Sequence, residues 1–174
     1  MKKILIVVDM QKDFVDGSLG SAEAVGIVPA AAELIKNFNG DIFVTLDTHY
    51  ENYLETAEGR KLPVKHCIKG TDGYKLDKRI AAALRGRKYK KVPKITFGSV
   101  DLPRLIKRAS AGEDFEIELI GLCTDICVIS NALVLKANFP EAKISVKADC
   151  CAGVTVEKHE AALEVMRSCL IDVI

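Results

Sequence analysis

The chain has 174 residues, of which 49% are hydrophobic and 28% are charged. This composition is ordinary for a globular protein with a full hydrophobic core, and we expect a single domain over residues 1–174. The 25 lysines and arginines nearly balance the 24 acidic residues, leaving a net charge of +1. The charge therefore gives no electrostatic reason to expect nucleic acid or an anionic membrane as a partner.

The N-terminus and the cysteines favour a cytoplasmic location. The opening MKKILIVVDM has two lysines, as a signal peptide can, but its apolar run is too short and ends in an aspartate. Without an export signal, the six cysteines indicate reduced thiols and argue against a disulfide framework.

Apolar runs and helical patterns alternate along the chain. Strands are predicted at residues 4–8, 41–46, 91–94, 116–120, 143–147 and 171–174, and helices at residues 28–38, 76–84, 100–109, 128–134 and 156–169. Residues 11–21 and 50–74 are predicted loops, and Cys150 and Cys151 are expected in a turn after the fifth strand. The alternation predicts an α/β fold, with a six-stranded parallel sheet between two layers of helices.

Two charged residues stand at the ends of predicted strands. Asp9 follows the first strand and Lys94 closes the third, and the carboxyl ends of parallel strands form the edge where open α/β sheets keep their sites. Both also have simpler interpretations. An aspartate there can bond to its own loop, and a lysine at a strand end is more often solvated surface.

Cys127 is the best candidate for a nucleophile. It follows a short apolar strand and Gly121, which allows a close backbone approach, and it precedes an apolar helix for which Thr124 or Asp125 is the predicted N-cap. The positive end of that helix would lower the thiol pKa from about 8.5. The alternative is a buried structural cysteine. Cys123 is separated from Cys127 by three residues, so the two do not form the usual redox pair.

A second group of residues suggests a metal site. Asp47 and His49 follow the second strand at a spacing that puts both side chains on one face of an extended chain. Glu58 and His66 could complete a mixed nitrogen and oxygen site for zinc, iron or manganese, with positions left for water. Histidines that lie on the surface or only form hydrogen bonds are the alternative. Phe14 is either a core residue or the wall of a pocket.

Three motifs in the right order resemble one enzyme family. Asp9 in VVDMQKDF, Lys94 in VPKITFGS and Cys127 in GLCTDICV are similar to the triad of the isochorismatase-like cysteine hydrolases. The resemblance covers essentially the whole chain. It implies that the three side chains gather at the carboxyl edge of a six-stranded parallel sheet, and it also implies a homo-oligomer.

The resemblance extends to the possible metal ligands. Asp47, His49 and His66 resemble the ligands of the nicotinamidase branch, and Glu58 resembles a further acidic ligand of some members. Isochorismatases proper generally lack this set, so an amidase ranks above a vinyl-ether hydrolase. The implied cofactor is one divalent metal ion, zinc first and iron or manganese as alternatives. It would orient the substrate, for example through a pyridine nitrogen.

The resemblance also implies a mechanism. Asp9 would take the proton of Cys127, Lys94 would hold the charged cluster together, and the thiolate would attack an amide carbonyl to release ammonia and leave a thioester. Water activated by Asp9 would then release the acid. The backbone N–H groups of Cys123 and Cys127 would stabilise the oxyanion, and the family pattern implies a cis peptide bond between Leu122 and Cys123.

One departure weakens the assignment of a substrate. Nicotinamidases usually have a tryptophan shortly before the last metal histidine, where it stacks on the substrate ring, whereas this chain has no tryptophan and places Leu62 or Pro63 there. Phe14 could form one wall, and the other could come from one of three tyrosines, Tyr50, Tyr53 and Tyr74. Nicotinamide is thus the favoured substrate, and another small carbamoyl or ureido amide is the alternative.

Two interpretations without hydrolysis remain open. The chain could be a metal-binding or redox thiol protein that keeps the fold, or an interaction protein that uses the fold as a scaffold. The first predicts that replacing Asp9 by asparagine leaves activity intact, and the second predicts that no thiol reacts fast.

Overall fold

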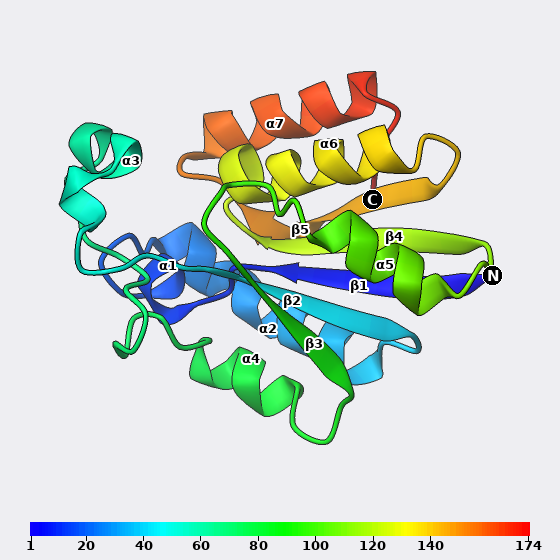
Figure 1. The fold of residues 1–174 in the computed structure, drawn as a ribbon, viewed down its shortest axis with the longest axis horizontal. Coiled ribbons are helices and arrows are strands. Elements are labelled where there is room, and N and C mark those ends of the chain that lie inside the picture. The colour runs from blue at the N-terminus through cyan, green and yellow to red at the C-terminus, as the bar shows by residue number, and fades with distance from the viewer.

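The computed structural model describes all 174 residues and contains one six-stranded sheet whose neighbouring strands are all parallel. The strands are β1 (Lys2–Val8), β2 (Asp41–Asp47), β3 (Tyr89–Lys94), β4 (Phe115–Leu122), β5 (Lys143–Ala152) and β6 (Asp172–Val173). Their order in space is β3-β2-β1-β4-β5-β6 (Figure 1). The predicted parallel α/β sheet is confirmed, and β3 is an edge strand, as Pro93 suggests.

Helices cover both faces of the sheet (Figure 1). One face carries α2 (Ala22–Asn37) and α4 (Lys78–Ala83), and the other carries α5 (Leu102–Ser110), α6 (Ile129–Asn138) and α7 (Val156–Ser168). Three short helices lie towards the carboxyl ends of the strands, namely α1 (Lys12–Val15), η1 (Tyr53–Glu55) and α3 (Ala57–Lys61), and a π-helical turn, η2 (Thr124–Val128), leads into α6. None of the helices combines the length and the hydrophobicity that a membrane crossing requires.

β1 occupies the middle of the sheet because both of its faces are apolar. Leu5 and Val7 belong to the core beneath α2, whereas Ile4, Ile6 and Val8 belong to the core beneath α5, α6 and α7. This division follows from the alternation of side chains along a strand. All five residues are buried, as is typical of a parallel strand covered on both faces.

One predicted helix start and two predicted loops differ from the structure. α2 begins at Ala22 and not at residue 28, because the hydroxyl of Ser21 accepts a hydrogen bond from the N–H of Ala24 at 3.0 Å and caps the helix. The predicted loops at residues 11–21 and 50–74 contain α1, and η1 and α3, respectively. These short helices lack a repeated apolar pattern, so periodicity does not reveal them.

The prediction of a turn at Cys150 and Cys151 is also wrong. Both cysteines are buried in β5, which continues to Ala152 and pairs there with the end of β4. The pairing register shifts between Leu119 and Gly121, so an irregularity within the ladder, and not the end of the strand, interrupts the apolar alternation.

The ends of β1 and β4 approach each other closely. Gly121 has a φ of 121°, and a Cβ atom built on it would lie 2.1 Å from the carbonyl oxygen of Val8. Asp9, the next residue after Val8, has a φ of 46°, which few residues other than glycine adopt. The close approach brings the chain after β1 next to the chain after β4.

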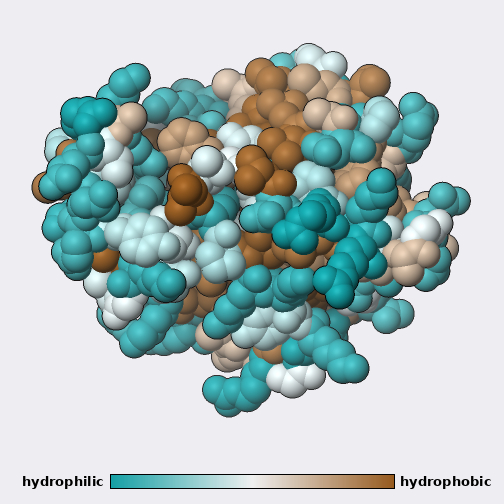
Figure 2. All heavy atoms as spheres, in the orientation of Figure 1, coloured by the Kyte–Doolittle hydropathy of each residue, from teal (hydrophilic) through white to brown (hydrophobic).

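The surface is mixed in character. Figure 2 shows hydrophilic side chains over most of the left and lower parts of this face, with hydrophobic atoms gathered in the upper middle. The segment after β3 is one source of exposed apolar side chains, with Ile95, Phe97 and Val100 all accessible to solvent.

Candidate active site

Asp9, Lys94 and Cys127 meet beyond the carboxyl ends of β1, β3 and β4. Lys94 Nζ lies 2.6 Å from Asp9 Oδ2 and 3.3 Å from Cys127 Sγ. All three residues are buried. Lys94 is therefore not a solvated surface residue. It extends across the end of β2, which lies between β3 and β1, and completes a cluster of the three residues singled out in the sequence.

Thr45 holds the carboxylate of Asp9. Its hydroxyl donates to Asp9 Oδ1 at 2.6 Å and also lies 3.2 Å from the Asp9 N–H, which donates to it. One carboxylate oxygen is thus occupied by Thr45, and the other faces Lys94. The sequence analysis missed Thr45. The signal was a single hydroxyl residue within the otherwise apolar run of β2, where a buried polar group needs a partner.

The cluster holds one proton on the thiol. Burial raises the pKa of Cys127 well above its ordinary value, and the Asp9 carboxylate raises it further. Burial also raises the pKa of Asp9, although Lys94 opposes that shift. Burial alone would lower the pKa of Lys94, but the neighbouring acidic groups raise it. We infer an ammonium, a carboxylate and a protonated thiol at rest.

The predicted lowering of the thiol pKa is therefore wrong. Cys127 lies in the buried π-helical turn η2, and the cost of burying an anion beside Asp9 exceeds the benefit of the nearby helix end. The predicted N-caps are wrong as well, because Cys123 occupies that position. Thr124 Oγ1 instead lies 2.8 Å from His159 Nδ1, and Asp125 Oδ1 accepts from the N–H of Val154 at 2.9 Å.

The backbone around Cys123 has the features that the resemblance implies. The peptide bond between Leu122 and Cys123 is cis. The carbonyl of Cys123 accepts hydrogen bonds from Ile126 and Val128, whereas its own N–H donates to no group of the protein. The N–H of Cys123 is thus free for a substrate oxygen, and the role of Cys123 and Cys127 as an oxyanion hole stays a prediction.

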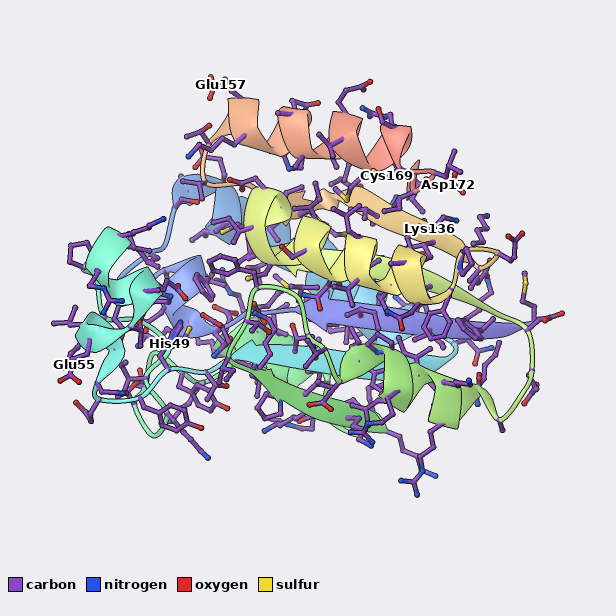
Figure 3. The ribbon with its side chains drawn as sticks, turned by 45° about the horizontal axis from the view of Figure 1, so that its top comes forward. His49, Glu55, Lys136, Glu157, Cys169 and Asp172 are labelled. Atoms are coloured by element: carbon purple, nitrogen blue, oxygen red, sulfur yellow. The ribbon has the colours of Figure 1, made fainter.

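The four predicted metal ligands also come together. Asp47 Oδ2 lies 3.0 Å from His49 Nε2 and 3.5 Å from His66 Nε2. Glu58 Oε1, on α3, lies 3.6 Å from the first of these nitrogens and 3.5 Å from the second. The ligand atoms of Asp47, His49 and His66 lie within 4.8 Å of one another. Figure 3 shows His49 and Glu55, a neighbour of α3, at the same end of the molecule.

The donor atoms fit a divalent metal ion. His49 Nε2 is buried and has no hydrogen-bond partner, because the geometry towards Asp47 Oδ2 does not make one. The Nδ1 of His66 lies 2.8 Å from the carbonyl oxygen of Val64; if it carries the proton, it donates there and leaves the Nε2 lone pair directed at the carboxylates. Two imidazoles with two carboxylates form a set that zinc, iron or manganese accepts.

The metal ligands are supported by residues that the sequence analysis missed. Gln11 is fully buried. Its side-chain amide donates to the carbonyl of Asp47 at 2.9 Å and accepts from the N–H of Asp47 at 2.8 Å. The ring of Tyr53 packs edge-on against His49 and His66, with centroids 4.7 and 5.1 Å apart. Gln11 stands in a predicted loop, where no sequence pattern indicates such a role.

A cavity of about 530 Å³ opens beside Cys127. Its lining includes Cys123 and Cys127, then Asp47, Glu58 and His66 of the metal cluster, and an apolar group made of Phe14, Leu19, Leu62, Ile126 and Val154. Phe14 thus lines the pocket, and its ring centroid lies 5.4 Å from that of His66. Leu62 lines the cavity near the position of the missing tryptophan, whereas none of the three tyrosines considered does.

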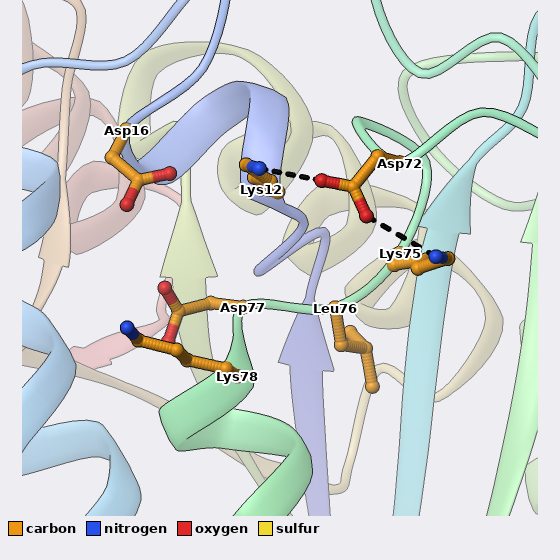
Figure 4. Close-up of a pocket in the computed structure, with 7 residues that line it drawn as sticks. All are labelled: Lys12, Asp16, Asp72, Lys75, Leu76, Asp77 and Lys78. Carbon is orange, nitrogen blue, oxygen red and sulfur yellow. Dashed lines mark hydrogen bonds and ion pairs between the residues drawn. The ribbon is translucent and has the colours of Figure 1, made fainter.

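A second hollow, of about 330 Å³, has a different character (Figure 4). It lies beside α1 and the start of α4 and is lined mostly by charged side chains. Asp72 pairs with Lys12 at 2.5 Å and with Lys75 at 3.1 Å. No cysteine or histidine lines it, so the candidate site is the cavity beside Cys127.

The chain matches known proteins over most of its length. The isochorismatase domain family model matches residues 3–174. An uncharacterized isochorismatase family protein of Bacillus subtilis (strain 168) is 33% identical over 146 residues, covering 76% of this chain and 78% of that protein. The nicotinamidase/pyrazinamidase of Mycobacterium tuberculosis is 28% identical over 188 residues, covering 99% of this chain and 98% of that protein.

Two solved structures are similar over their whole length. The pyrazinamidase of Pyrococcus horikoshii in complex with zinc has a TM-score of 0.82 and 27% identity, covering 100% of this chain and 99% of that chain. The N-carbamoylsarcosine amidase of Thermoplasma acidophilum has a TM-score of 0.80 and 27% identity, covering 99% of this chain and 95% of that chain.

Proposed function

Because the chain belongs to the isochorismatase domain family, we propose that it is a cysteine-dependent amidohydrolase that releases ammonia from a small amide. It is a hydrolase of non-peptide C–N bonds, and nicotinamide is the first candidate substrate. The observation that carries the proposal is the buried contact of Lys94 with both Asp9 and Cys127 beside a cavity of suitable size.

The protonation of the cluster supports a definite order of steps. Asp9 accepts the proton of Cys127 as the sulfur attacks the amide carbon, and Lys94 stays charged between them. The N–H groups of Cys123 and Cys127 receive the developing oxyanion. Asp9 passes the proton to the leaving nitrogen, so ammonia departs and a thioester remains. Water then gives a proton to Asp9, attacks the thioester and releases the acid, and the thiol is restored.

Asp47, His49, Glu58 and His66 are the residues that would hold the metal ion. When bound, the ion would orient the substrate by binding a polar atom such as a ring nitrogen. Asp47, Glu58 and His66 line the cavity, and of the four residues only Asp47 also lies near Lys94, at 3.5 Å. This arrangement supports an orienting role for the site and leaves activation of the thiol to Asp9.

A second candidate substrate class has its own support. Leu62 lines the cavity, which has no tryptophan, and Phe14 is its one aromatic wall apart from His66. A flat aromatic ring therefore has less to stack on, and the similar N-carbamoylsarcosine amidase acts, by its name, on a carbamoyl compound. A small carbamoyl or ureido amide is the alternative to nicotinamide, whereas the metal ligand set disfavours the vinyl-ether hydrolase.

Ammonia release from a panel of amides tests the proposal. Nicotinamide, pyrazinamide and several carbamoyl and ureido amides would be compared for the wild type and Cys127→Ala, with Cys169→Ala as a matched control. Ammonia release that depends on Cys127 supports the cysteine mechanism. The amide with the highest kcat/KM identifies the substrate class. Equal rates for the wild type and Cys127→Ala would contradict the cysteine mechanism.

We also propose that residues 1–174 act as one domain and that the chain forms a homo-oligomer. The exposed apolar side chains of Ile95, Phe97 and Val100 support the second point, because they could be covered by another copy. Sedimentation velocity on the wild type measures the oligomeric state directly, and a monomer at micromolar concentration would contradict the proposed homo-oligomer.

A further inference from the structure

We propose that the amide substrate carries an anionic group and that Lys158 binds this group at the cavity beside Cys127. The inference rests on the proposed amidase function, and within it favours an aliphatic amide over nicotinamide, which carries no anionic group. It starts from the charges that line the cavity. These are the two carboxylates of Asp47 and Glu58, which face the metal histidines, and the ammonium of Lys158.

Lys158 has no partner within the protein. The ion pairs formed by the lysines of this chain do not include it. Its acidic neighbours in the chain, Glu157 and Glu160, form no ion pair with it and do not line the cavity, and Asp125 accepts a hydrogen bond from the N–H of Val154. Lys94 is paired with Asp9 outside this lining, so Lys158 is the one lysine or arginine that lines the cavity, and it has no ionic partner in the protein.

The position of Lys158 runs against the local preference of a helix. It is the third residue of α7, and its backbone N–H donates to the capping hydroxyl of Thr155. Cations are unfavourable in the first turn of a helix, where the dipole is positive, and anions are favourable. The start of α7 and the ammonium of Lys158 both favour an anion at this part of the cavity, and Glu157, in the same helical turn, does not line it.

The start of α7 lies at the same end of the molecule as the metal cluster. Figure 3 shows Glu157, the neighbour of Lys158, at the end that also holds His49, whereas Cys169 and Asp172 lie towards the opposite end. Cys123 and Cys127 line the same cavity as Lys158. A small molecule can therefore place its amide at the sulfur and a carboxylate at Lys158, and the apolar walls suit an aliphatic linker. The predicted class is a short aliphatic amide with a carboxylate.

A matched pair of ligands tests this class. Succinamate and 4-oxopentanamide share the same carboxamide and chain length, and the second replaces the carboxylate by an uncharged methyl ketone. Their dissociation constants would be measured by calorimetry in the Cys127→Ala background, where turnover does not interfere. We expect succinamate to bind roughly fivefold more tightly than 4-oxopentanamide, as for a partly exposed ion pair. This ratio of the two dissociation constants should fall as the salt concentration rises.

Variants at position 158 identify the source of the preference. Lys158→Ala should reduce the ratio to about one, Lys158→Glu should invert it, and Lys158→Arg should largely restore it, whereas Lys107→Ala, which removes an exposed charge from α5, should leave it unchanged. The proposal is overturned if succinamate does not bind more tightly than 4-oxopentanamide, including if neither binds, or if Lys158→Ala weakens both ligands equally. Loss of Cys127-dependent ammonia release for every amide would overturn the amidase function without changing this binding result.

Discussion

One carboxylate oxygen of Asp47 lies 3.5 Å from Lys94 Nζ, and its other oxygen lies 3.0 Å from His49 Nε2. A single buried side chain thus touches both the cluster around Cys127 and the proposed metal ligands. Burial alone would raise the pKa of Asp47, but the two neighbouring histidines and the charge of Lys94 lower it well below its ordinary value. Asp47 is therefore ionised at neutral pH and supplies charge to both groups.

Replacing Asp47 by asparagine should remove most of the bound metal and also lower kcat. The substitution keeps the shape but removes the charge that faces the histidines and Lys94. Elemental analysis of the purified protein measures the metal, and the wild type should hold about one ion per chain. Asp41→Asn is the control, because Asp41 lies at the other end of β2 and pairs with Lys2 near the surface. A metal-free wild type would remove the metal from the proposal.

Gln11 should tune the affinity for that metal. Its side-chain amide fixes the backbone of Asp47, and residues that support metal ligands in this way typically contribute 10- to 100-fold in affinity, so we expect roughly that loss in Gln11→Ala. Gln11→Glu should also weaken binding, because a carboxylate oxygen would face the carbonyls of Asp47 and Tyr74, which the amide N–H now bonds.

Competition with a zinc chelator measures the affinity of the Gln11 variants. Lys12→Ala serves as the control, since Lys12 is the next residue in the chain but pairs at the surface with Asp72. A lower melting temperature with unchanged metal affinity would show that Gln11 has only a structural role.

Thr45→Val should move the acid limb of the pH profile to higher pH. The base must be ionised to accept the proton of Cys127, and the Thr45 hydroxyl stabilises the ionised form of Asp9. Removing this hydrogen bond raises the pKa of Asp9, so activity is lost at a higher pH than in the wild type. The profile of kcat/KM against pH reports this shift. Thr45→Ser keeps the hydroxyl and should restore the wild-type profile. If Thr45→Val and Thr45→Ser have the same acid limb, the hydrogen bond from Thr45 does not set the pKa of the base.

Asp9→Asn should separate turnover from thiol reactivity. Loss of the base should reduce ammonia release by about 10²- to 10⁴-fold. The same change removes a negative charge that raises the pKa of Cys127, so the thiolate fraction at a given pH increases and iodoacetamide should label Cys127 faster than in the wild type.

Peptide mapping of the labelled protein distinguishes Cys127 from the other five cysteines. Asn37→Ala, at the exposed end of α2, is a control that should alter neither rate. Retained ammonia release in Asp9→Asn would contradict the role of Asp9 as the base.

The order of elements follows from local sequence. The run from Ile4 to Val8 predicts a central strand because every residue is apolar and most are β-branched, and the same reasoning locates β2 and β4 within two residues of their observed bounds. Parallel strands place their carboxyl ends at one edge, so Asp9 and Cys127 were expected to meet. The role of Lys94 was predicted only from the resemblance of its motif to the family, because a lysine at the end of a strand is more often a solvated surface residue.

The tertiary structure alone decided the chemistry of that edge. The sequence predicts a thiol activated by a helix end, whereas the buried contact with Asp9 raises the pKa of Cys127, because desolvation and a neighbouring charge depend on residues far apart in the chain. Thr45, Gln11 and Lys158 gained their proposed roles for the same reason. The sequence by itself determined the sheet and which residues stand at its edge, since these depend on local patterns. The protonation of Cys127, the support of the proposed metal ligands and the charge of the proposed substrate depend on contacts between residues that are far apart in the chain.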